Sequence, residues 1–567
     1  MKLTLKLLSM LLAILMLLSA CTEAGSPNET TETETVITTE AVSESATEEE
    51  TEPPLSEYRA SISRSRAELE EMLTLQDEEF TAAHEKLKEF EELAVVSSDY
   101  DAVDALYMEF EDMFYHIDTQ VSIASVIYYL DTINEEASGK YLDSYDLYGD
   151  LYNAYIESCK NVYNNSPIRD QLFADWTEEE IKELFAYDPE TQELREINEE
   201  LLVELNALPA DEFFDRSAEI YTELVTNNNK IAELSGYDNY YLYASKEIYG
   251  RDYGIEEIER FVDYTEKYYL PNHETVNNRW QVRYSKLSEK DFDLMYGFLF
   301  DPFDGLDKNY VEGYINSFEG SMYDGLHHMF ENRNVVFASS LNSHQSAFQT
   351  YFTELEMPFC LYGYHGQASS TIIHEMGHYY ASLYNENVNS FDLAETQSQS
   401  NEMLLLKYLD GEMPSAVYSA VKGYTLYNFM LQSIVCVIID EFEREVYALD
   451  SVEGYTSKDY DAIMAKICEK YGGVDYLKKN VVDINEYWRL TATNSPVYYI
   501  SYAVSITEAL NIFTIAEQDE AKAREVYRIL IEEVEENDGF LEAIGKADLA
   551  SPFEEKTFED VLATLLK

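Results

Sequence analysis

Residues 364–378 read YHGQASSTIIHEMGH and end in an H-E-x-x-H motif. Residues four apart on a helix project from one face, so His374 and His378 can offer two imidazole nitrogens to one zinc ion. Glu375 follows the first histidine, and its carboxylate then lies beside the metal, where it can accept a proton from the attacking water. The motif therefore predicts a helix that carries a zinc site and its general base, although the pattern can also arise by chance.

A zinc site of this type needs a third protein ligand. Residues 393–405 read LAETQSQSNEMLL, and we interpret them as a second helix entered from Asn389-Ser390. Glu395 and Glu402 are seven residues apart, so after two turns they face nearly the same way. A solvated acidic face is the alternative, but the small and apolar neighbours favour a site.

The segment before the motif, Met357–Tyr364, is a short apolar run with aromatic residues that is consistent with an edge strand. The unpaired amides of such an edge can hold an extended peptide beside a metal. Gly363 and Gly366 would allow a close backbone approach to substrate. His365 lies between them and either contacts substrate or makes a local hydrogen bond in a turn.

Residues 494–502, NSPVYYISY, predict a helix start with Ser495 as N-cap and Pro496 at the first helical position. Tyr499 and Tyr502 are then three apart on one side. Their phenols can donate hydrogen bonds to the oxyanion of a tetrahedral intermediate. The chain has 48 tyrosines, so ordinary packing is the alternative.

The helix predicted at 393–405 resembles the second zinc-site helix of oligoendopeptidase F and its thimet oligopeptidase relatives. The resemblance rests on Ala394-Glu395 and on residues 401–405. Looser resemblances precede it at 221–225, 236–240 and 291–296. The resemblance covers roughly residues 200–510. It implies a mainly α fold, a two-lobed helical ellipsoid with a deep central channel and a small β-sheet beside the H-E-x-x-H helix.

The resemblance also implies roles for individual residues. Glu395 would be the third ligand of one zinc ion per chain, and Glu402 would accept the far N–H of a zinc-bound imidazole. Tyr499 and Tyr502, or Tyr498, would serve the transition state. Two features depart from the family: the ligands are separated by 395 − 378 − 1 = 16 residues, a short spacing, and Thr491 stands where a histidine is expected.

The composition limits the classes of partner. Lys and Arg number 39 against 110 Asp and Glu, a net charge of −71, which argues against nucleic acid. The acidic excess fits a hydrated surface, or alternatively a preference for basic substrates. Of the five cysteines, Cys159, Cys360, Cys436 and Cys468 lie among apolar or helical residues, so we expect buried free thiols rather than disulfides.

The N-terminus is read as a targeting segment. Residues 1–20 have basic residues, an apolar run and small residues, and Leu18-Ser-Ala-Cys21 resembles the lipobox of bacterial lipoproteins, with Cys21 as the lipidated residue. An uncleaved membrane anchor is the alternative. Residues 21–57 are rich in Thr and Glu and predict a disordered tether. We expect an N-terminal helical region at 58–200 and a zinc-peptidase catalytic region at 201–567.

The sequence thus predicts a zinc-dependent oligoendopeptidase that cleaves internal bonds of short unstructured peptides, held on the outer face of a bacterial cell membrane by its lipid anchor. No obligate protein partner is expected. Two alternatives stay open: an exopeptidase of another H-E-x-x-H/Glu family, and a catalytically impaired peptide-binding lipoprotein.

Overall fold

The structure is a computed structural model that describes residues 56–567 apart from 175, 178–180, 182–183, 186–188, 207, 209–212, 301–306, 386–389 and 481–483. The predicted signal segment, Cys21 and nearly all of the predicted tether lie outside the described residues. The remainder is mainly helical with a small sheet, which confirms the predicted fold class.

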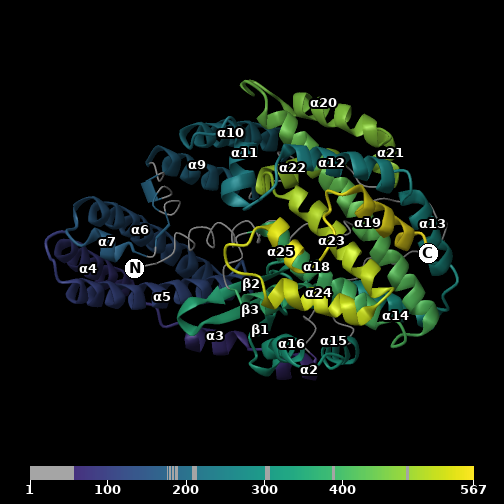
Figure 1. Cartoon of the computed structure of the whole chain (residues 1–567), viewed down its shortest axis with the longest axis horizontal. Coiled ribbons are helices and arrows are strands. Elements are labelled where there is room, and N and C mark those ends of the chain that lie inside the picture. Colours follow the sequence, from purple (N-terminus) through teal and green to yellow (C-terminus); the bar gives the residue numbers. More distant parts are fainter. Residues whose placement is uncertain are drawn as a thin grey trace, which may run out of the picture.

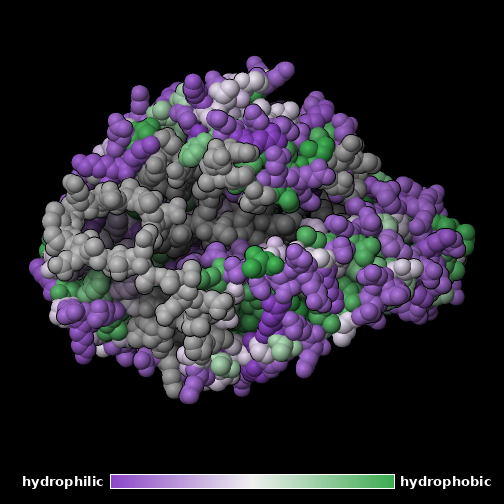
Figure 2. All heavy atoms as spheres, turned by 180° about the vertical axis from the view of Figure 1, so that it is seen from behind, coloured by the Kyte–Doolittle hydropathy of each residue, from purple (hydrophilic) through white to green (hydrophobic). Residues whose placement is uncertain are grey.

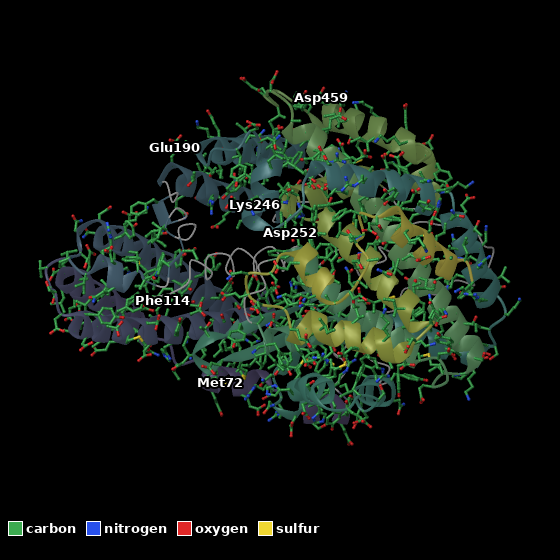
Figure 3. The ribbon with its side chains drawn as sticks, viewed as in Figure 1. Met72, Phe114, Glu190, Lys246, Asp252 and Asp459 are labelled. Atoms are coloured by element: carbon green, nitrogen blue, oxygen red, sulfur yellow. The ribbon has the colours of Figure 1, made fainter. Side chains whose placement is uncertain are left out.

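Helices near the start of the described chain share an apolar stripe that forms a core of its own. Phe80, Leu87 and Phe90 are buried at the three- and four-residue spacing that the sequence shows. In Figure 3, Phe114 lies among these helices at the narrow end of the molecule. This core is built by α4 (Asp77–Ala94), α5 (Tyr100–Tyr129), α6 (Glu135–Asn165) and α7 (Arg169–Leu172). The two short helices that precede them, α2 (Glu57–Ile62) and α3 (Arg66–Met72), pack against other clusters.

A second set of helices follows and packs into the largest core, together with the C-terminal part of the chain. Two of its segments widen into π-helical turns at Ala244–Ile248 and Thr265–Tyr269. The helices are α9 (Pro189–Asn206), α10 (Phe213–Leu234), α11 (Tyr240–Tyr243), α12 (Ile255–Tyr264), α13 (His273–Tyr284), α14 (Glu289–Phe300), α15 (Asp307–Ile315) and α16 (Ser321–Glu331).

The described residues form one sheet of three strands, β1 (Val335–Phe337), β2 (Ala347–Phe352) and β3 (Met357–Tyr362). The order is β1-β3-β2, with β1 parallel and β2 antiparallel to β3. The prediction of an edge strand at 357–364 is therefore wrong, because β3 is the central strand. Its apolar run is continuous since both of its faces are covered.

Successive residues of β3 face two different cores. Phe359 and Leu361 pack with residues of α5 such as Ile127, whereas Cys360 and Tyr362 pack with the C-terminal helices. One face of the sheet thus rests on the N-terminal helices, and the other supports the helix that carries the H-E-x-x-H motif.

The remaining helices build the body around that motif. They are α17 (Ser369–Ser382), α18 (Phe391–Tyr408), α19 (Ser415–Tyr447), α20 (Ser457–Cys468), α21 (Val474–Asn480), α22 (Ile484–Asn494), α23 (Tyr499–Ala516), α24 (Glu520–Glu532), α25 (Phe540–Lys546) and α26 (Glu555–Leu565). Short 3-10 turns lie at Thr353–Leu355 and Glu469–Tyr471. Among the described helices, α19 and α23 are long and apolar enough to cross a membrane, yet both are mostly buried as core helices.

The molecule is elongated, with α4 to α7 at its narrow end and the C-terminal helices in the broad body (Figure 1). Figure 2 shows the opposite face, where hydrophilic side chains cover most of the coloured surface and hydrophobic ones are scattered among them. The four cysteines from Cys159 to Cys468 are buried and free, as expected from the sequence.

Glu508 is a buried carboxyl on α23 that affects stability. It is fully buried, its Oε2 accepts a hydrogen bond from Asn511 Nδ2 at 3.2 Å, and its Oε1 has no partner. Burial raises the pKa of Glu508 to about 8. The folded chain therefore keeps a proton that the unfolded chain loses above its ordinary pKa of about 4.3.

Wild type should lose part of its stability as pH rises, because Glu508 then loses its proton, and we expect Glu508→Gln to be free of this loss. Since the folded pKa is the higher one, the wild-type contribution is complete at low pH and is lost as pH rises through the window up to about 8. Urea unfolding at pH 5 and pH 8.5 should show the variant gaining stability over wild type only at the higher pH. An equal difference at both pH values would contradict the assignment.

Candidate metal centre

The H-E-x-x-H motif lies on α17, which is fixed to the central strand by two contacts. Tyr362 donates its hydroxyl hydrogen bond to the carbonyl of Ile372 at 3.1 Å, and the thiol of Cys360 donates to the carbonyl of Glu375 at 3.8 Å. The residues of β3 that face α17 thus set the height of the motif above the sheet.

The helix α17 also lies unusually close to α18. A Cβ on Gly377 would come within 2.7 Å of the Cα of Ser398, so only glycine allows this approach. Asn401 Nδ2 donates to the carbonyl of Ile373 at 2.7 Å and ties the two helices together. The glycine inside the motif therefore brings Glu395 to the two histidines.

Replacing Gly377 by Ala is expected to weaken both the fold and the metal site. The added methyl group meets backbone rather than a flexible side chain, and overpacking of this kind costs about 1–3 kcal/mol, more than the gain in helix propensity of about 1 kcal/mol. The midpoint temperature of thermal unfolding of the metal-free chain and the affinity for zinc would both fall. The control is Gly545→Ala on α25, where no atom lies within 4 Å of an added Cβ and neither quantity should fall.

The structure brings His374, His378 and Glu395 together, with one ligand atom of each within 4.8 Å of the others. Glu395 Oε2 is 3.5 Å from His374 Nε2 and 3.9 Å from His378 Nε2. The Nε2 atom of His378 is buried and has no hydrogen-bond partner. Two imidazoles, one carboxylate and an orphaned buried nitrogen fit a zinc ion.

Electrostatics distinguish the two histidines. Burial holds the pKa of His378 well below its usual range, with the charge of His374 acting in the same direction, so His378 is neutral and ready to bind a cation. Burial also lowers the pKa of His374, but the hydrogen bond and charge of Glu402 outweigh it and raise that pKa to about 9. Glu402 Oε1 lies 2.8 Å from His374 Nδ1, the contact expected from the sequence, and this contact fixes the ring so that Nε2 faces Glu395.

Glu375 lies beside this cluster and is 2% exposed. Its Oε2 is buried without a hydrogen-bond partner. Burial raises the pKa of Glu375 to about 7, against the opposing influence of His374. A carboxylate with a free oxygen and a pKa near neutrality has the properties of a general base.

The predicted start of the tyrosine helix is wrong. Residues 495–498 form a turn in which Val497 has a φ of 68°, and α23 begins at Tyr499 without a side-chain cap. Tyr498 donates its hydroxyl hydrogen bond to Glu395 Oε1 at 2.6 Å, so this tyrosine contacts a candidate ligand. Tyr499 and Tyr502 pack beside it, with ring centroids 6.0 and 5.0 Å from that of Tyr498.

The two glycines before the motif make close contacts within the chain itself. A Cβ on Gly363 would lie 1.9 Å from the carbonyl oxygen of His344, and one on Gly366 would meet the backbone of Ser346. The close approach that glycine permits is thus to the segment leading into β2. His365 is exposed, and its contact with substrate stays a prediction, as does that of the two glycines.

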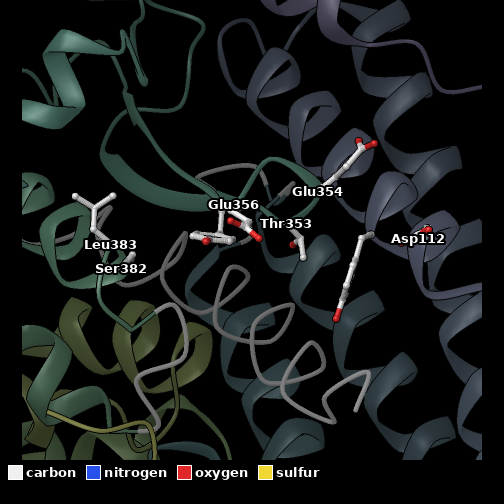
Figure 4. A pocket seen from close by; sticks show the side chains of 8 residues that line it. Asp112, Thr353, Glu354, Glu356, Ser382 and Leu383 are labelled. Atoms are coloured by element: carbon white, nitrogen blue, oxygen red, sulfur yellow. The ribbon is translucent and has the colours of Figure 1, made fainter. Parts of the chain in front are cut away.

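A pocket of about 730 Å³ opens just beyond the end of α17 (Figure 4). Its walls come from α5, from the end of β2 with the following turn, and from the last residues of α17. The lining residues are Asp112, Tyr115, Tyr351, Thr353, Glu354, Glu356, Ser382 and Leu383. The pocket is acidic, and it lies between the N-terminal helices and the part of the chain that holds the motif.

Three site features could not be expected from the motif. Ser398 Oγ donates to Glu395 Oε2 at 3.2 Å, and Asn401 ties the two helices; both residues lie within the predicted helix, whose periodicity could have pointed to them. Glu443 Oε1 accepts from the Val497 amide at 2.6 Å, a contact between residues 54 apart that no local pattern indicates. The adjacent histidines His327 and His328 diverge, since His328 Nδ1 bonds the hydroxyl of Tyr379 and the His327 ring stacks on Tyr323.

Solved structures share this architecture. PZ peptidase A with an inhibitor matches with a TM-score of 0.64 at 18% identity, over 89% of this chain and 97% of its own. A protein designated oligoendopeptidase F from Bacillus anthracis str. Ames gives a TM-score of 0.62 at 18% identity, over 88% of this chain and 95% of its own. The chain has the oligoendopeptidase F fold.

Oligoendopeptidase F from Enterococcus faecium gives a TM-score of 0.51 at 15% identity, over 86% of this chain and 96% of its own. No protein-family model and no curated protein sequence matches. At these identities the oligoendopeptidase F likeness is one of fold.

Proposed function

We propose that the protein is a zinc-dependent oligoendopeptidase. The observation that carries the proposal is the convergence of His374, His378 and Glu395, with Glu375 beside them, on a fold shared with oligoendopeptidase F and PZ peptidase A. His374, His378 and Glu395 would hold one zinc ion. When bound, zinc supplies a Lewis acid that polarises the scissile carbonyl and lowers the pKa of the attacking water.

The chain's own residues then have defined tasks. Glu375 accepts a proton from the attacking water on its free Oε2 and passes it to the leaving amine, a task for which a pKa near neutrality is suited. Glu402 keeps His374 oriented and deprotonated at Nε2 once a cation is present. Tyr499 and Tyr502 are proposed as donors to the developing oxyanion.

The substrates are proposed to be short unstructured peptides. The pocket beyond α17 has a volume of about 730 Å³, and its carboxylates Asp112, Glu354 and Glu356 provide no partner for a free peptide carboxylate. An exopeptidase needs a group that binds a free terminus. We therefore favour internal cleavage over trimming from the C-terminus.

The location is proposed from the sequence alone. The basic and apolar residues of segment 1–20 and the small residues before Cys21 support export and lipidation, and the Thr/Glu-rich segment after it supports a tether. We propose a lipoprotein on the outer face of a bacterial cell membrane.

The test combines metal analysis with cleavage mapping. The purified chain is analysed by mass spectrometry for bound metal and then incubated with a mixed peptide library in which both ends of half of the peptides are blocked. We expect one zinc ion per chain and internal cuts in blocked and free peptides alike, abolished by a chelator and restored by zinc. Cleavage of free-ended peptides only would identify an exopeptidase, and absence of zinc would reject the proposal.

A further inference from the structure

The turn between α22 and α23 contains a buried residue in an unfavourable backbone conformation. Val497 is 1% exposed and has a φ of 68°. A β-branched side chain rarely adopts this left-handed region, and such a conformation persists only where the surroundings hold it. Tyr498, the next residue, bonds the candidate ligand Glu395. The contacts that hold Val497 therefore bear on the metal centre.

Two buried side chains, a carboxyl and a guanidinium, hold the Val497 peptide from opposite sides. Its N–H donates to Glu443 Oε1 at 2.6 Å, and its carbonyl accepts from Arg251 Nη2 at 2.7 Å. Glu443 and the side chain of Arg251 are 0% exposed. A hydrogen bond from a charged guanidinium in a dry environment is among the strongest in proteins. Burial raises the pKa of Glu443 well above its usual range, so its carboxyl keeps its proton and accepts from the Val497 amide through an uncharged oxygen. The strained peptide is thus fixed at both of its polar atoms.

Arg251 is itself anchored to the helices that carry the site. Its Nη2 also donates to Ser501 Oγ on α23 at 2.9 Å, and its Nε lies 3.9 Å from Asp392 Oδ2 in the first turn of α18. The guanidinium packs 4.7 Å from the centroid of the Tyr249 ring, whose hydroxyl donates to the carbonyl of Pro496 at 2.7 Å. One arginine therefore links the turn, α18 and α23.

Tyr498 holds one of the two carboxylate oxygens of Glu395. The Tyr498 hydroxyl donates to Oε1 at 2.6 Å, while Oε2 lies 3.5 Å from His374 Nε2. Without the Tyr498 hydroxyl, the 3.2 Å bond from Ser398 Oγ to Oε2 would remain as the side-chain hydrogen bond that holds the carboxylate toward the histidines in the described contacts. Residues that support a ligand in this way commonly change metal affinity about 10- to 100-fold when lost.

We propose that Glu443 and Arg251 are positioning residues of the metal centre, which hold the Val497 peptide so that Tyr498 fixes Glu395 toward the two histidines. The inference rests on the proposed function, since it assumes that these groups bind zinc. It assigns a task to a buried acid and a buried arginine that contact neither a ligand atom nor the general base.

The first test measures zinc affinity by competition with a chelator. Glu443→Ala removes the acceptor for the Val497 amide and should weaken zinc binding about 10- to 100-fold. Glu443→Gln keeps an acceptor oxygen at the same length and should restore most of the affinity. Equal affinities of wild type and Glu443→Ala would overturn the inference.

The matched control is Asp440→Ala. Asp440 lies one turn earlier on α19, is 1% exposed, and bonds Tyr241 and Arg444 rather than the Val497 peptide. The Asp440→Ala substitution should lower the thermal stability of the metal-free chain without changing zinc affinity. A loss of affinity as large as that of Glu443→Ala would show a general effect of a damaged core and overturn the inference.

A double-mutant cycle tests whether Glu443 acts through Tyr498. Tyr498→Phe removes only the hydroxyl that bonds Glu395, and in that background Glu443→Ala should cost little further affinity. If Glu443→Ala lowers zinc affinity by the same factor in the Tyr498→Phe background as in wild type, Glu443 does not act through Tyr498 and the inference is overturned. If Glu443→Ala does not fold, Glu443→Asp, which withdraws the acceptor by one methylene, takes its place in the cycle.

The failures of the two proposals are distinguishable. A wild-type chain that binds no zinc rejects the proposed function and the inference with it. A wild-type chain that binds zinc and cleaves peptides, with unchanged affinity in the Glu443 and Tyr498 variants, rejects the inference alone.

Discussion

Replacing Glu375 by Gln is expected to lower the turnover of peptide hydrolysis by about 10²- to 10⁴-fold while zinc stays bound, the range typical of losing a general base. Gln has the same shape but cannot accept the proton. The wild-type carboxylate is buried, has one oxygen without a partner, and has a pKa raised by burial to about 7. The measurement is kcat on an internally quenched peptide, with zinc content by mass spectrometry on the same sample.

The matched control for this variant is Glu508→Gln. Both glutamates are buried, both have one oxygen without a partner, and burial raises the pKa of both. Glu508 lies on α23 but bonds Asn511 and contacts none of the candidate ligands in the described contacts. Its variant should keep wild-type kcat. Equal, negligible turnover of wild type and Glu375→Gln with zinc bound would instead support a peptide-binding protein without catalysis.

Replacing His378 by Ala is expected to lower zinc affinity by more than about 100-fold, the upper range for a residue that merely supports a ligand, and to abolish hydrolysis. The imidazole has no other task in the described contacts, because its Nε2 is buried without a hydrogen-bond partner. Its pKa is held well below the usual range, so it does not act as a buried cation. Dialysis followed by metal analysis gives the affinity change.

In the metal-free state, His378→Ala should lower the free energy of unfolding only by the packing that the imidazole contributes, since no hydrogen bond in the described contacts is broken. The control is His328→Ala, which removes a bond to Tyr379 and also tests the adjacent histidine pair as an alternative metal site. It should keep full zinc content. Zinc retained by His378→Ala and lost by His328→Ala would place the metal elsewhere.

Helical periodicity predicted which site residues share a face of each helix, and the resemblance to oligoendopeptidase F implied that the two faces meet. The spacing of His374 and His378 on one helix, and of Glu395 and Glu402 on the next, places all four side chains at one crossing of α17 and α18. The glycine of the motif then explains how closely the helices approach. Such patterns are local, so they survive without knowledge of the rest of the fold.

Two features depended on distant residues and were predicted wrongly. The strand Met357–Tyr362 is central because β1 and β2 flank it, although its continuous apolar run was a signal for a strand covered on both faces. Ser495 and Pro496 are a good local helix start, but Glu443 and Arg251 hold Val497 in a left-handed conformation that no helix contains. Tertiary contacts override local preference at both places.

The sheet has a consequence for the modularity of the chain. Phe348, Phe359 and Leu361 are covered by α5 and its neighbours, so the strand that supports the metal helix shares its other face with the N-terminal helices. A truncated chain that begins at residue 201 would expose this apolar face, and we expect it to aggregate, as size-exclusion chromatography would show. The N-terminal helices are therefore expected to behave as a structural cover for this sheet, and not as a part that can be removed without loss of solubility.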